Sequence, residues 1–479
     1  MFIGLDLGTS GLKGVLIDER QAIVAEASAP LTVERPQDGW SEQDPASWLS
    51  ACEAVMGALG ARADLGGVRG IGLSGQMHGA TLLDAGHEVL RPCILWNDTR
   101  SHREAAALDA DPRFRAVTGN IVFPGFTAPK LAWVRAQEPG VFARVALVLL
   151  PKDYLRLWLT GEAVAEMSDA AGTSWLDVGR RDWDDGLLAA TGLSRGQMPR
   201  LVEGSEVSGT LREELASRWS LPTGVVVAGG GGDNAASAVG VGVVRGGQAF
   251  VSLGTSGVLF AASDAYRPDA ASAVHTFCHA LPETWHQMGV ILAAADALNW
   301  WAGVAGEGAS SLTGSLGSLR APGRTLFLPY LGGERTPHND AAVRAGFLHL
   351  DHASDRQAMT RAVLEGVTFA IRDCFDALAG TGTRFDRLIA VGGGSRSDYW
   401  LRAIATALGM PVEVPVAGDF GGAFGAARLG LMAATGAGPE VATPPGIERV
   451  VEPDGVLAPA FAEAHARYRD AYAALKGRA

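Results

Sequence analysis

The sequence predicts an α/β protein built from two domains of like fold that face each other across a cleft. At 479 residues the chain is too long for one ordinary hydrophobic core. The pentapeptide Leu-Gly-Thr-Ser-Gly occurs twice, at residues 7–11 and 253–257, each time between two strand-like apolar runs. Copies this far apart cannot form a solenoid. They indicate two similar domains, which we place at residues 1–245 and 246–479.

Each copy predicts a β-hairpin whose small-residue turn can bind phosphate. In the first copy apolar residues alternate from Ile3 to Leu7 and resume at Val15. Glycines in the turn let backbone N–H groups approach an anion, and Asp6 precedes the turn as a carboxylate suited to Mg²⁺ or to water on Mg²⁺. The alternative is an ordinary tight hairpin, because 63 residues of the chain are glycine.

Composition and net charge limit the kinds of molecule that the protein is expected to bind. A formal net charge of −12 argues against nucleic acid and anionic membranes, although Mg²⁺ and backbone amides could still neutralise a nucleotide. The four cysteines are far apart and form no disulfide framework, which indicates a reducing compartment. No apolar run approaches the roughly 18 residues of a membrane span. We expect a cytoplasmic protein.

In the first half, Asp44 and Pro45 predict the N-cap and first residue of a helix. A strand ending near Leu73 runs into the polar segment 74–79, and another strand-like run ends in the polar segment 97–100. Polar residues at strand ends are where a ligand is usually bound. The alternative for each segment is a capped turn with surface polar residues.

A second candidate functional segment lies at residues 225–240, where a buried strand and four glycines precede an acidic residue that opens a helix. This pattern places Asp233 at a helix N-terminus with little to shield it. The glycines imitate a dinucleotide fingerprint, but no Asp or Glu occurs between Asp233 and Asp264 to hold a ribose. No Gly-Lys-Ser or Gly-Lys-Thr occurs either, so a Walker P-loop is excluded.

In the second half, the His and Cys side chains of residues 275–279 are interpreted as core and not as a metal site. Residues 308–319 predict a loose Ser/Gly-rich loop, and Ser354 with Gln357 predicts a capping box for a long helix. Residues 388–408 predict a strand, a glycine turn and a helix from Asp398, which suits a nucleotide base and ribose. An ordinary βα turn is the alternative.

With these residues assembled, the chain resembles the FGGY-type carbohydrate kinases, and among them most closely the xylulokinases, over nearly its whole length. The segments that carry the resemblance are Gly4–Lys13, Trp40–Pro45, Gly75–Gly79, Trp96–Asp98, Pro124–Lys130, Pro151–Tyr154, Met167–Thr173, Gly231–Ala235 and Glu334–His338. Thr99 stands where xylulokinases often have Gly, a departure that removes no ligand group.

The resemblance implies two ribonuclease-H-like, actin-type domains with ATP and a sugar meeting in the cleft. It implies that Asp233 is the catalytic base and a further Mg²⁺ ligand, and that Asp6 is the catalytic carboxylate near Mg²⁺. The implied sugar-binding residues are Met77, His78, Asp98 and Asn234. The implied nucleotide-binding residues are Gly8, Thr9, Ser10, Lys13, Gly254, Thr255, Gly393, Gly394 and Asp398.

The implied reaction is ATP-dependent phosphorylation of D-xylulose at its terminal 5-hydroxyl, by a monomer or homodimer without a nucleic-acid or membrane partner. Within the same class the alternative substrate is another ketopentose or a polyol. From another class, the alternative is a non-catalytic actin-type nucleotide switch. Such a switch has no use for Met77, His78, Asp98 and Asp233 converging on a polar cleft.

Overall fold

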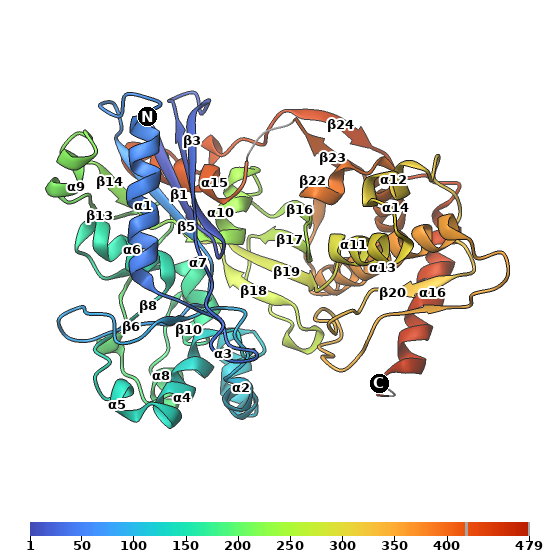
Figure 1. Cartoon of the computed structure of the whole chain (residues 1–479), viewed down its shortest axis with the longest axis horizontal. Coiled ribbons are helices and arrows are strands. Elements are labelled where there is room, and N and C mark those ends of the chain that lie inside the picture. The colour runs from blue at the N-terminus through green and yellow to red at the C-terminus, as the bar shows by residue number, and fades with distance from the viewer. Residues whose placement is uncertain (417–419, 478–479) are drawn as a thin grey trace.

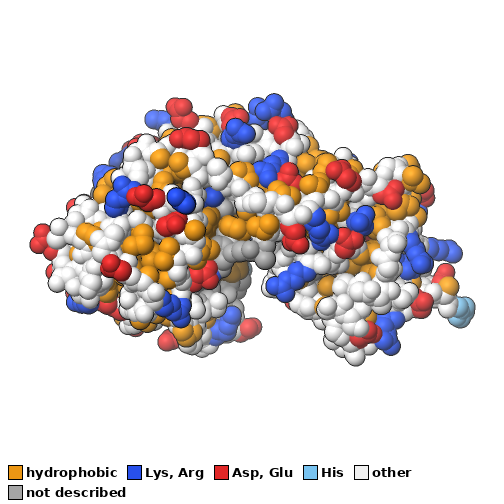
Figure 2. Space-filling view, turned by 90° about the horizontal axis from the view of Figure 1, so that it is seen from above, with side chains coloured by type: hydrophobic (Ala, Val, Ile, Leu, Met, Phe, Trp, Pro, Cys, Tyr) orange, Lys and Arg blue, Asp and Glu red, His pale blue; other side chains and the backbone are white. Residues whose placement is uncertain are grey.

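The chain forms two lobes, each built on a mixed β-sheet with helices on its faces (Figure 1). The structure is a computed structural model that describes residues 1–416 and 420–477. Seen from above in the space-filling view, a notch separates the two lobes, and basic and acidic side chains are interspersed over both (Figure 2). None of the helices in the described ranges is long and apolar enough to cross a membrane.

The first sheet holds the N-terminal hairpin at its centre. Its strand order is β13 (Val207–Thr210), β14 (Val226–Ala228), β5 (Gly70–Gly75), β1 (Phe2–Leu7), β2 (Gly11–Ile17) and β3 (Ile23–Pro30), with β15 (Gly231–Gly232) also on β5. β1 runs antiparallel to β2 and parallel to β5, and β5 runs parallel to β14. The carboxyl ends of β1 and β5 therefore meet at one edge, where Asp6 lies opposite Ser74.

The second sheet repeats this arrangement. Its order is β18 (His275–Cys278), β19 (Trp285–Ile291), β17 (Gly257–Ser263), β16 (Gly247–Leu253), β22 (Phe385–Val391), β23 (Val412–Pro415) and β24 (Ile447–Val451). β16 pairs antiparallel with β17 and parallel with β22, as β1 pairs with β2 and β5. The predicted duplication of an α/β fold is thus confirmed, and β18 is an addition at one edge.

Helices and short strands complete each lobe. The first half carries α1 (Pro45–Gly60), α2 (His102–Asp109), α3 (Pro112–Thr118), α4 (Thr127–Gln137), α5 (Pro139–Phe142), α6 (Pro151–Thr160), α7 (Met167–Ala170), α8 (Asp185–Ala190), α9 (Glu213–Arg218) and α10 (Asp233–Gly240). The second half carries α11 (Ala295–Ala305), α12 (Ala309–Gly314), α13 (Arg356–Gly380), α14 (Asp398–Leu408), α15 (Gly422–Thr435) and α16 (Ala458–Leu475). Paired short strands are β4 (Glu42–Gln43) with β7 (Cys93–Ile94), β6 (Thr81–Leu83) with β8 (Leu147–Leu149), β9 (Val164–Glu166) with β12 (Arg200–Val202), β10 (Leu176–Asp177) with β11 (Asp182–Trp183), and β20 (Leu326–Leu328) with β21 (Gly346–Leu348).

Helix α15 packs on the first sheet although it comes from the second half of the sequence. A Cβ at Gly4 of β1 would lie 1.8 Å from the Ala423 carbonyl oxygen, and one at Gly72 of β5 would lie 1.8 Å from that of Ala426. Only glycine permits a helix to approach a sheet backbone this closely. The division at residues 245 and 246 remains a prediction, and α15 lies with the first lobe in space.

Two local predictions in the second half are wrong. Helix α13 is capped by Asp355, whose carboxylate accepts a hydrogen bond from the Ala358 N–H at 2.8 Å. Ser354 is not the cap, because its hydroxyl accepts from the Asp351 N–H at 2.9 Å instead. Residues 308–319 contain helix α12, since Leu312 is buried in the core of the second lobe and tertiary packing outweighs weak helix propensity there. The predicted cap of α1, Asp44, is confirmed.

Candidate active site

The first hairpin places its polar groups at the carboxyl edge of the first sheet. The Gly8 N–H donates to the Gly11 carbonyl at 3.0 Å and closes the turn. The Thr9 hydroxyl donates to Gln76 Oε1 at 2.9 Å and accepts from Trp96 Nε1 at 2.9 Å. The turn of the first hairpin is therefore hydrogen-bonded to the segments that follow β5 and β7.

Asp6 is the penultimate residue of β1, lies next to this turn and faces the start of α15. Ser74 on β5 donates its hydroxyl to Asp6 Oδ1 at 2.7 Å. Burial raises the pKa of Asp6, while the Ser74 hydrogen bond and the charge of Lys13 oppose the rise. A Cβ at Gly422, the first residue of α15, would lie 2.8 Å from Asp6 Oδ2, so glycine leaves room for this carboxylate.

Asp233 is the first residue of α10 and lies close enough to Asp6 for their charges to interact. Burial, and then the negative charge of Asp6, raise the pKa of Asp233 to about 6. Its Oδ1 accepts from the Asn234 backbone N–H at 2.7 Å and from Asn234 Nδ2 at 2.9 Å. A carboxylate whose pKa lies near neutrality is suited to accept a proton during a reaction.

His78, the residue after Met77, is held in an unusual conformation. Its φ is +69°, a left-handed backbone that is uncommon outside glycine. The Thr127 hydroxyl at 3.1 Å and Lys130 Nζ at 2.8 Å both donate to the His78 carbonyl. The His78 ring stacks on Phe126 with centroids 4.5 Å apart. The backbone and the ring are therefore both fixed.

The protonation of His78 follows from its partners. Burial and the nearby charge of Lys130 lower the pKa of His78 to about 3, so the ring is neutral. Its Nδ1 lies 2.7 Å from the Gly172 carbonyl oxygen, which can only accept, so Nδ1 carries the proton. Nε2 is then a hydrogen-bond acceptor, which suits a sugar hydroxyl.

Met77 brings this segment against the Asp233 turn. A Cβ at Gly232 would lie 2.9 Å from Met77 Cγ, so the Met77 side chain packs directly on the Gly232 backbone. Asn234, on the other side of Asp233, lines a cavity of about 850 Å³ between the lobes. Asp233 is thus placed between the Met77–His78 segment and the cavity.

The cavity is lined mainly by the second lobe. Its walls come from α10, β16, β22 with the following glycine turn, β23, β24 and the two residues just before α15. Gly392 and Gly393 line it, and Gly392 has a φ of +88°. Arg396, Glu448 and Arg449 also line it. The volume lies within the range of ordinary small-ligand sites.

The second hairpin is tied to helix α11. The Gly254 carbonyl accepts from the Ala295 N–H at 2.8 Å, and the Thr255 carbonyl accepts from the Ala294 N–H at 2.8 Å. These bonds orient the turn between β16 and β17 at the carboxyl edge of the second sheet. The hairpin occupies in the second sheet the position that residues 8–11 occupy in the first.

Several predicted site residues make other contacts. The Asp98 carboxylate accepts from the Ser41 N–H at 2.6 Å and from Arg100 Nε and Nη2, so it fixes the loop that carries Trp96. Asp398 pairs with Arg402 and Arg449. Lys13 Nζ lies 3.6 Å from Glu26 Oε1 and forms an ion pair with it. A Cβ at Gly394 would lie 2.7 Å from Leu253 Cβ, so this glycine packs against β16.

The sequence alone does not reveal several residues that hold His78 in place or line the cavity. Lys130 is buried, and burial lowers its pKa to about 7. Its ammonium group donates to the His78 and Gly125 carbonyls, which no local pattern reveals. Phe250, Pro415, Phe420 and Arg449 line the cavity but lie in ordinary strands and loops. Only the fold brings them together.

Comparison with known proteins identifies the family. Residues 1–240 match the N-terminal domain, and residues 249–434 the C-terminal domain, of the FGGY family of carbohydrate kinases. The chain is 50% identical to a xylulose kinase of Escherichia coli over 439 residues, 91% of this chain and 90% of that protein.

Solved structures agree with this assignment. A crystal structure of a xyloylose kinase from Brucella ovis has a TM-score of 0.99 and 63% identity, covering 100% of both chains. A xylulose kinase from Rhodospirillum rubrum has a TM-score of 0.93 and 30% identity, covering 99% of this chain and 98% of that chain. The chain belongs to the FGGY family of carbohydrate kinases and has the two-domain actin-like ATPase fold.

Proposed function

We propose that the protein transfers the γ-phosphoryl group of ATP to the terminal 5-hydroxyl of D-xylulose. The observation that carries the proposal is the place of Asp233, between the Met77–His78 segment and the cavity that Asn234 lines. The names of the similar proteins, xylulose kinase and xyloylose kinase, support the choice of sugar. The family supports a kinase reaction.

Asp233 acts as the general base. Both hydrogen bonds from Asn234 use Oδ1, so we assign the sugar hydroxyl proton to Oδ2. The hydroxyl oxygen then forms its bond to the γ-phosphorus as the bond to the ADP oxygen breaks. Because the pKa of Asp233 is about 6, the carboxylate is ionised at neutral pH and still basic enough to accept the proton.

His78 and Met77 orient the sugar. The His78 Nε2 acceptor binds one hydroxyl, and Met77 forms the apolar side of the same wall. Asp98 acts by holding its loop through Arg100 and Ser41, and Asn234 by orienting Asp233. Alignment of the hydroxyl with the phosphorus is the main contribution that such contacts make.

The two hairpins bind the phosphates from opposite lobes. We assign the backbone N–H groups of Thr9 and Ser10 to the phosphates from the first lobe, with Gly8 closing the turn through its bond to the Gly11 carbonyl, and those of Gly254 and Thr255 from the second. Lys13 adds a positive charge beside Asp6. The base and ribose enter the cavity along Gly393, with Gly394 and Asp398 shaping the turn behind it.

The residues present fit a single Mg²⁺. Among residues 1–416 and 420–477, no three His, Cys, Asp or Glu side chains form a ready metal cage. Mg²⁺ needs none, since it keeps several waters and binds through one or two carboxylates and substrate phosphates. The interacting pair Asp6 and Asp233, both with raised pKa values, would hold it, Asp6 through water. When bound, Mg²⁺ neutralises charge on the phosphate oxygens.

A panel of sugars tests the proposal directly. Purified protein with ATP and Mg²⁺ is scored for ADP release with D-xylulose, other ketopentoses and polyols. We expect D-xylulose to give the highest kcat/KM and the product to carry phosphate at the 5-position. A higher kcat/KM with another ketopentose or a polyol would reassign the substrate, and ADP release that no sugar stimulates would favour a nucleotide switch.

A further inference from the structure

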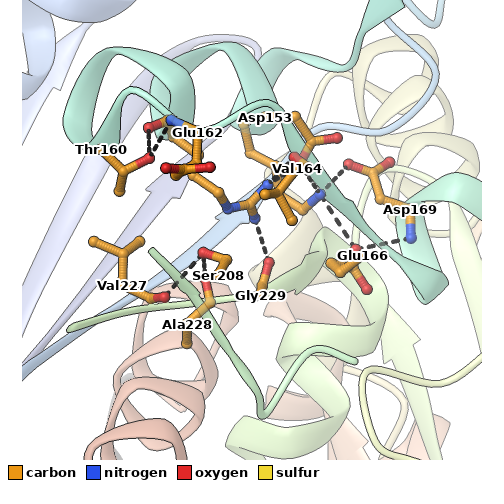
Figure 3. Close-up of polar contacts among 12 residues, drawn as sticks. Asp153, Thr160, Glu162, Val164, Glu166, Asp169, Ser208, Val227, Ala228 and Gly229 are labelled. Carbon is orange, nitrogen blue, oxygen red and sulfur yellow. Dashed lines mark hydrogen bonds and ion pairs between the residues drawn. The ribbon is translucent and has the colours of Figure 1, made fainter. Parts of the chain in front are cut away.

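Five charged side chains form a group that contacts the glycine turn before Asp233, directly and through Ser168, and all five are completely buried. Figure 3 labels Asp153, Glu166 and Asp169 among them. Lys152, Asp153 and Arg156 come from α6, Glu166 from the end of β9, and Asp169 from α7. Lys152 Nζ lies 2.8 Å from Asp169 Oδ2, 2.9 Å from Asp153 Oδ1 and 3.2 Å from Glu166 Oε1. We call these five residues the buried charge cluster.

The charges of the cluster balance only if one carboxyl is protonated. Burial, and then the charges of Asp153 and Glu166, raise the pKa of Asp169 well above its usual range although Lys152 opposes this. Burial lowers the pKa of Lys152, but the three carboxyl groups outweigh it and raise the value overall. Two cations then face two carboxylates and one neutral carboxyl group. Burying this many charges is costly, and apolar residues of similar size would often be as stable.

The cluster reaches the backbone on both sides of the glycine turn. Arg156 Nη2 donates to the Gly229 carbonyl. The Gly232 N–H donates to the Ser168 hydroxyl oxygen at 3.0 Å, and that hydroxyl donates to Glu166 Oε2 at 2.7 Å. Asp233 follows Gly232 directly. The cluster therefore contacts the turn at its first glycine and at its last.

The glycine sequence of the turn does not fix its conformation by itself. Residues 229–232 are all glycine, and Gly230 has a φ of +81°, so the chain itself restricts this turn very little. A general base must be held within about 0.5 Å of its working position, and a misplacement of about 1 Å can cost 10²-fold in rate. The constraint must come from residues outside the turn.

We propose that the buried charge cluster positions the catalytic base, with Ser168 as the residue that transmits this constraint to Gly232 and Asp233. Ser168 is a positioning residue, since it contacts the backbone next to the base and not the substrate. The same cluster supports the proposed sugar side, because Lys152 Cβ would lie 3.0 Å from a Cβ at Gly75, two residues before Met77. The inference rests on the proposed function of Asp233.

The test is Ser168→Ala, because Lys152→Met leaves several buried charges unpaired and is expected to unfold the protein. The matched control is Ser208→Ala. Ser208 is a buried serine whose hydroxyl donates to the carbonyls of Val227 at 2.9 Å and Ala228 at 3.1 Å, on the strand before the turn (Figure 3). It touches the backbone leading to the turn but not the residue next to Asp233.

Two measurements separate positioning from a loss of stability. We expect Ser168→Ala to lower kcat about tenfold with the KM values for D-xylulose and ATP within twofold of wild type. In hydrogen exchange followed by mass spectrometry, peptides covering residues 229–234 should exchange faster in Ser168→Ala than in wild type. Ser208→Ala should keep the wild-type kcat and the wild-type exchange at residues 229–234.

Unchanged kcat and unchanged exchange in Ser168→Ala would overturn the inference, and so would equal losses of kcat in both variants. Wild-type protein assayed beside them tests the proposed function separately. If the wild type phosphorylates D-xylulose and Ser168→Ala behaves like it, the proposed function stands and the positioning role fails. If the wild type does not act on D-xylulose, the substrate is wrong, and the exchange of residues 229–234 alone decides whether the cluster constrains the turn.

Discussion

Replacing Asp233 with asparagine should remove activity and stabilise the protein at the same time. An amide keeps the shape of the side chain but cannot accept the hydroxyl proton. Loss of a general base typically lowers kcat about 10²–10⁴-fold, which corresponds to about 3–5 kcal/mol of activation free energy. Sugar binding should remain, because the sugar contacts that we assign to His78 and Met77 are unchanged.

The gain in stability follows from the raised pKa. The pKa of Asp233 is about 6 in the folded protein, against 3.8 for an unperturbed carboxyl, because burial and Asp6 disfavour the ionised form. Between pH 4 and pH 6 the folded state binds more protons than the unfolded state, so stability falls as pH rises through this window. Above it the ionised carboxylate costs on the order of 3 kcal/mol, and less to the extent that the side chain is reached by water.

Thermal unfolding without substrates measures this effect. At pH 8 Asp233→Asn should unfold a few °C above wild type, and at pH 4 the two proteins should unfold at about the same temperature. Asp398→Asn is the control, because the pKa of Asp398 is shifted in the opposite direction to that of Asp233. Arg402 lowers the pKa of Asp398, with Arg449 adding to this, so the exposed carboxylate should stabilise the fold slightly or not at all at pH 8.

Two results would refute the reasoning. Equal unfolding temperatures of wild type and Asp233→Asn at pH 8 would show that no electrostatic penalty is stored at this site. Turnover close to wild type in the purified variant would remove Asp233 as the base. The two measurements are independent, so the electrostatic penalty and the role of Asp233 as the base are tested separately.

Three further predictions concern the metal, the sugar and the cleft. Asp6→Ala should abolish turnover and weaken Mg-ATP binding while sugar affinity persists in isothermal titration; the reverse pattern would contradict the metal role. His78→Ala should raise the KM for D-xylulose far more than that for ATP, and equal changes in both values would favour a structural role. Because the hairpins at residues 8–11 and 254–257 belong to different sheets, sugar binding should close the lobes and limit ATP hydrolysis by water. Small-angle scattering should then show a smaller radius of gyration with D-xylulose, whereas unchanged scattering with sugar-independent hydrolysis as fast as phosphorylation would contradict closure.

The fold could be predicted because its signals are local and occur twice. The pentapeptide at residues 7–11 and 253–257 sits between apolar runs that alternate with strand periodicity, and the structure has a hairpin at each. Asp44 before Pro45 marks the start of α1 for the same reason, since both residues act within one helical turn. At residues 354–355 two good caps stand side by side, and the sequence does not show which one the neighbouring turn uses.

The site could be predicted only as far as its motifs reach. Asp6 and Asp233 are candidates in the sequence because one stands near the end of a strand and the other opens a helix, and His78 because it lies in the polar segment that follows β5. Their roles stay predictions. The ion pair between Asp98 and Arg100 cannot be predicted in the same way. Two polar residues in one loop can bind a ligand or pair with each other, and the sequence is the same in both cases. Nor does the sequence show that Lys130 and Lys152 are buried, since a lysine is ordinarily a surface residue and only long-range contacts bury it.

Two elements from the second half of the sequence, α15 and β18, are held by the first lobe, and this restricts how the cleft can close. Helix α15 is locked to the first sheet and to α10, because a Cβ at Gly425 would lie 1.7 Å from the Ala236 carbonyl oxygen. The edge strand β18 is held by the first lobe, since Asn120 Nδ2 donates to the Thr276 carbonyl at 2.8 Å and the Thr276 N–H donates to Asn120 Oδ1 at 2.9 Å. Closely packed backbones do not slide continuously, so both contacts stay fixed during a rigid-body rotation. If the cleft closes, we therefore expect the second lobe to turn about an axis near α15 and β18, so that its hairpin, which is tied to α11, moves toward the first hairpin with the rest of that lobe.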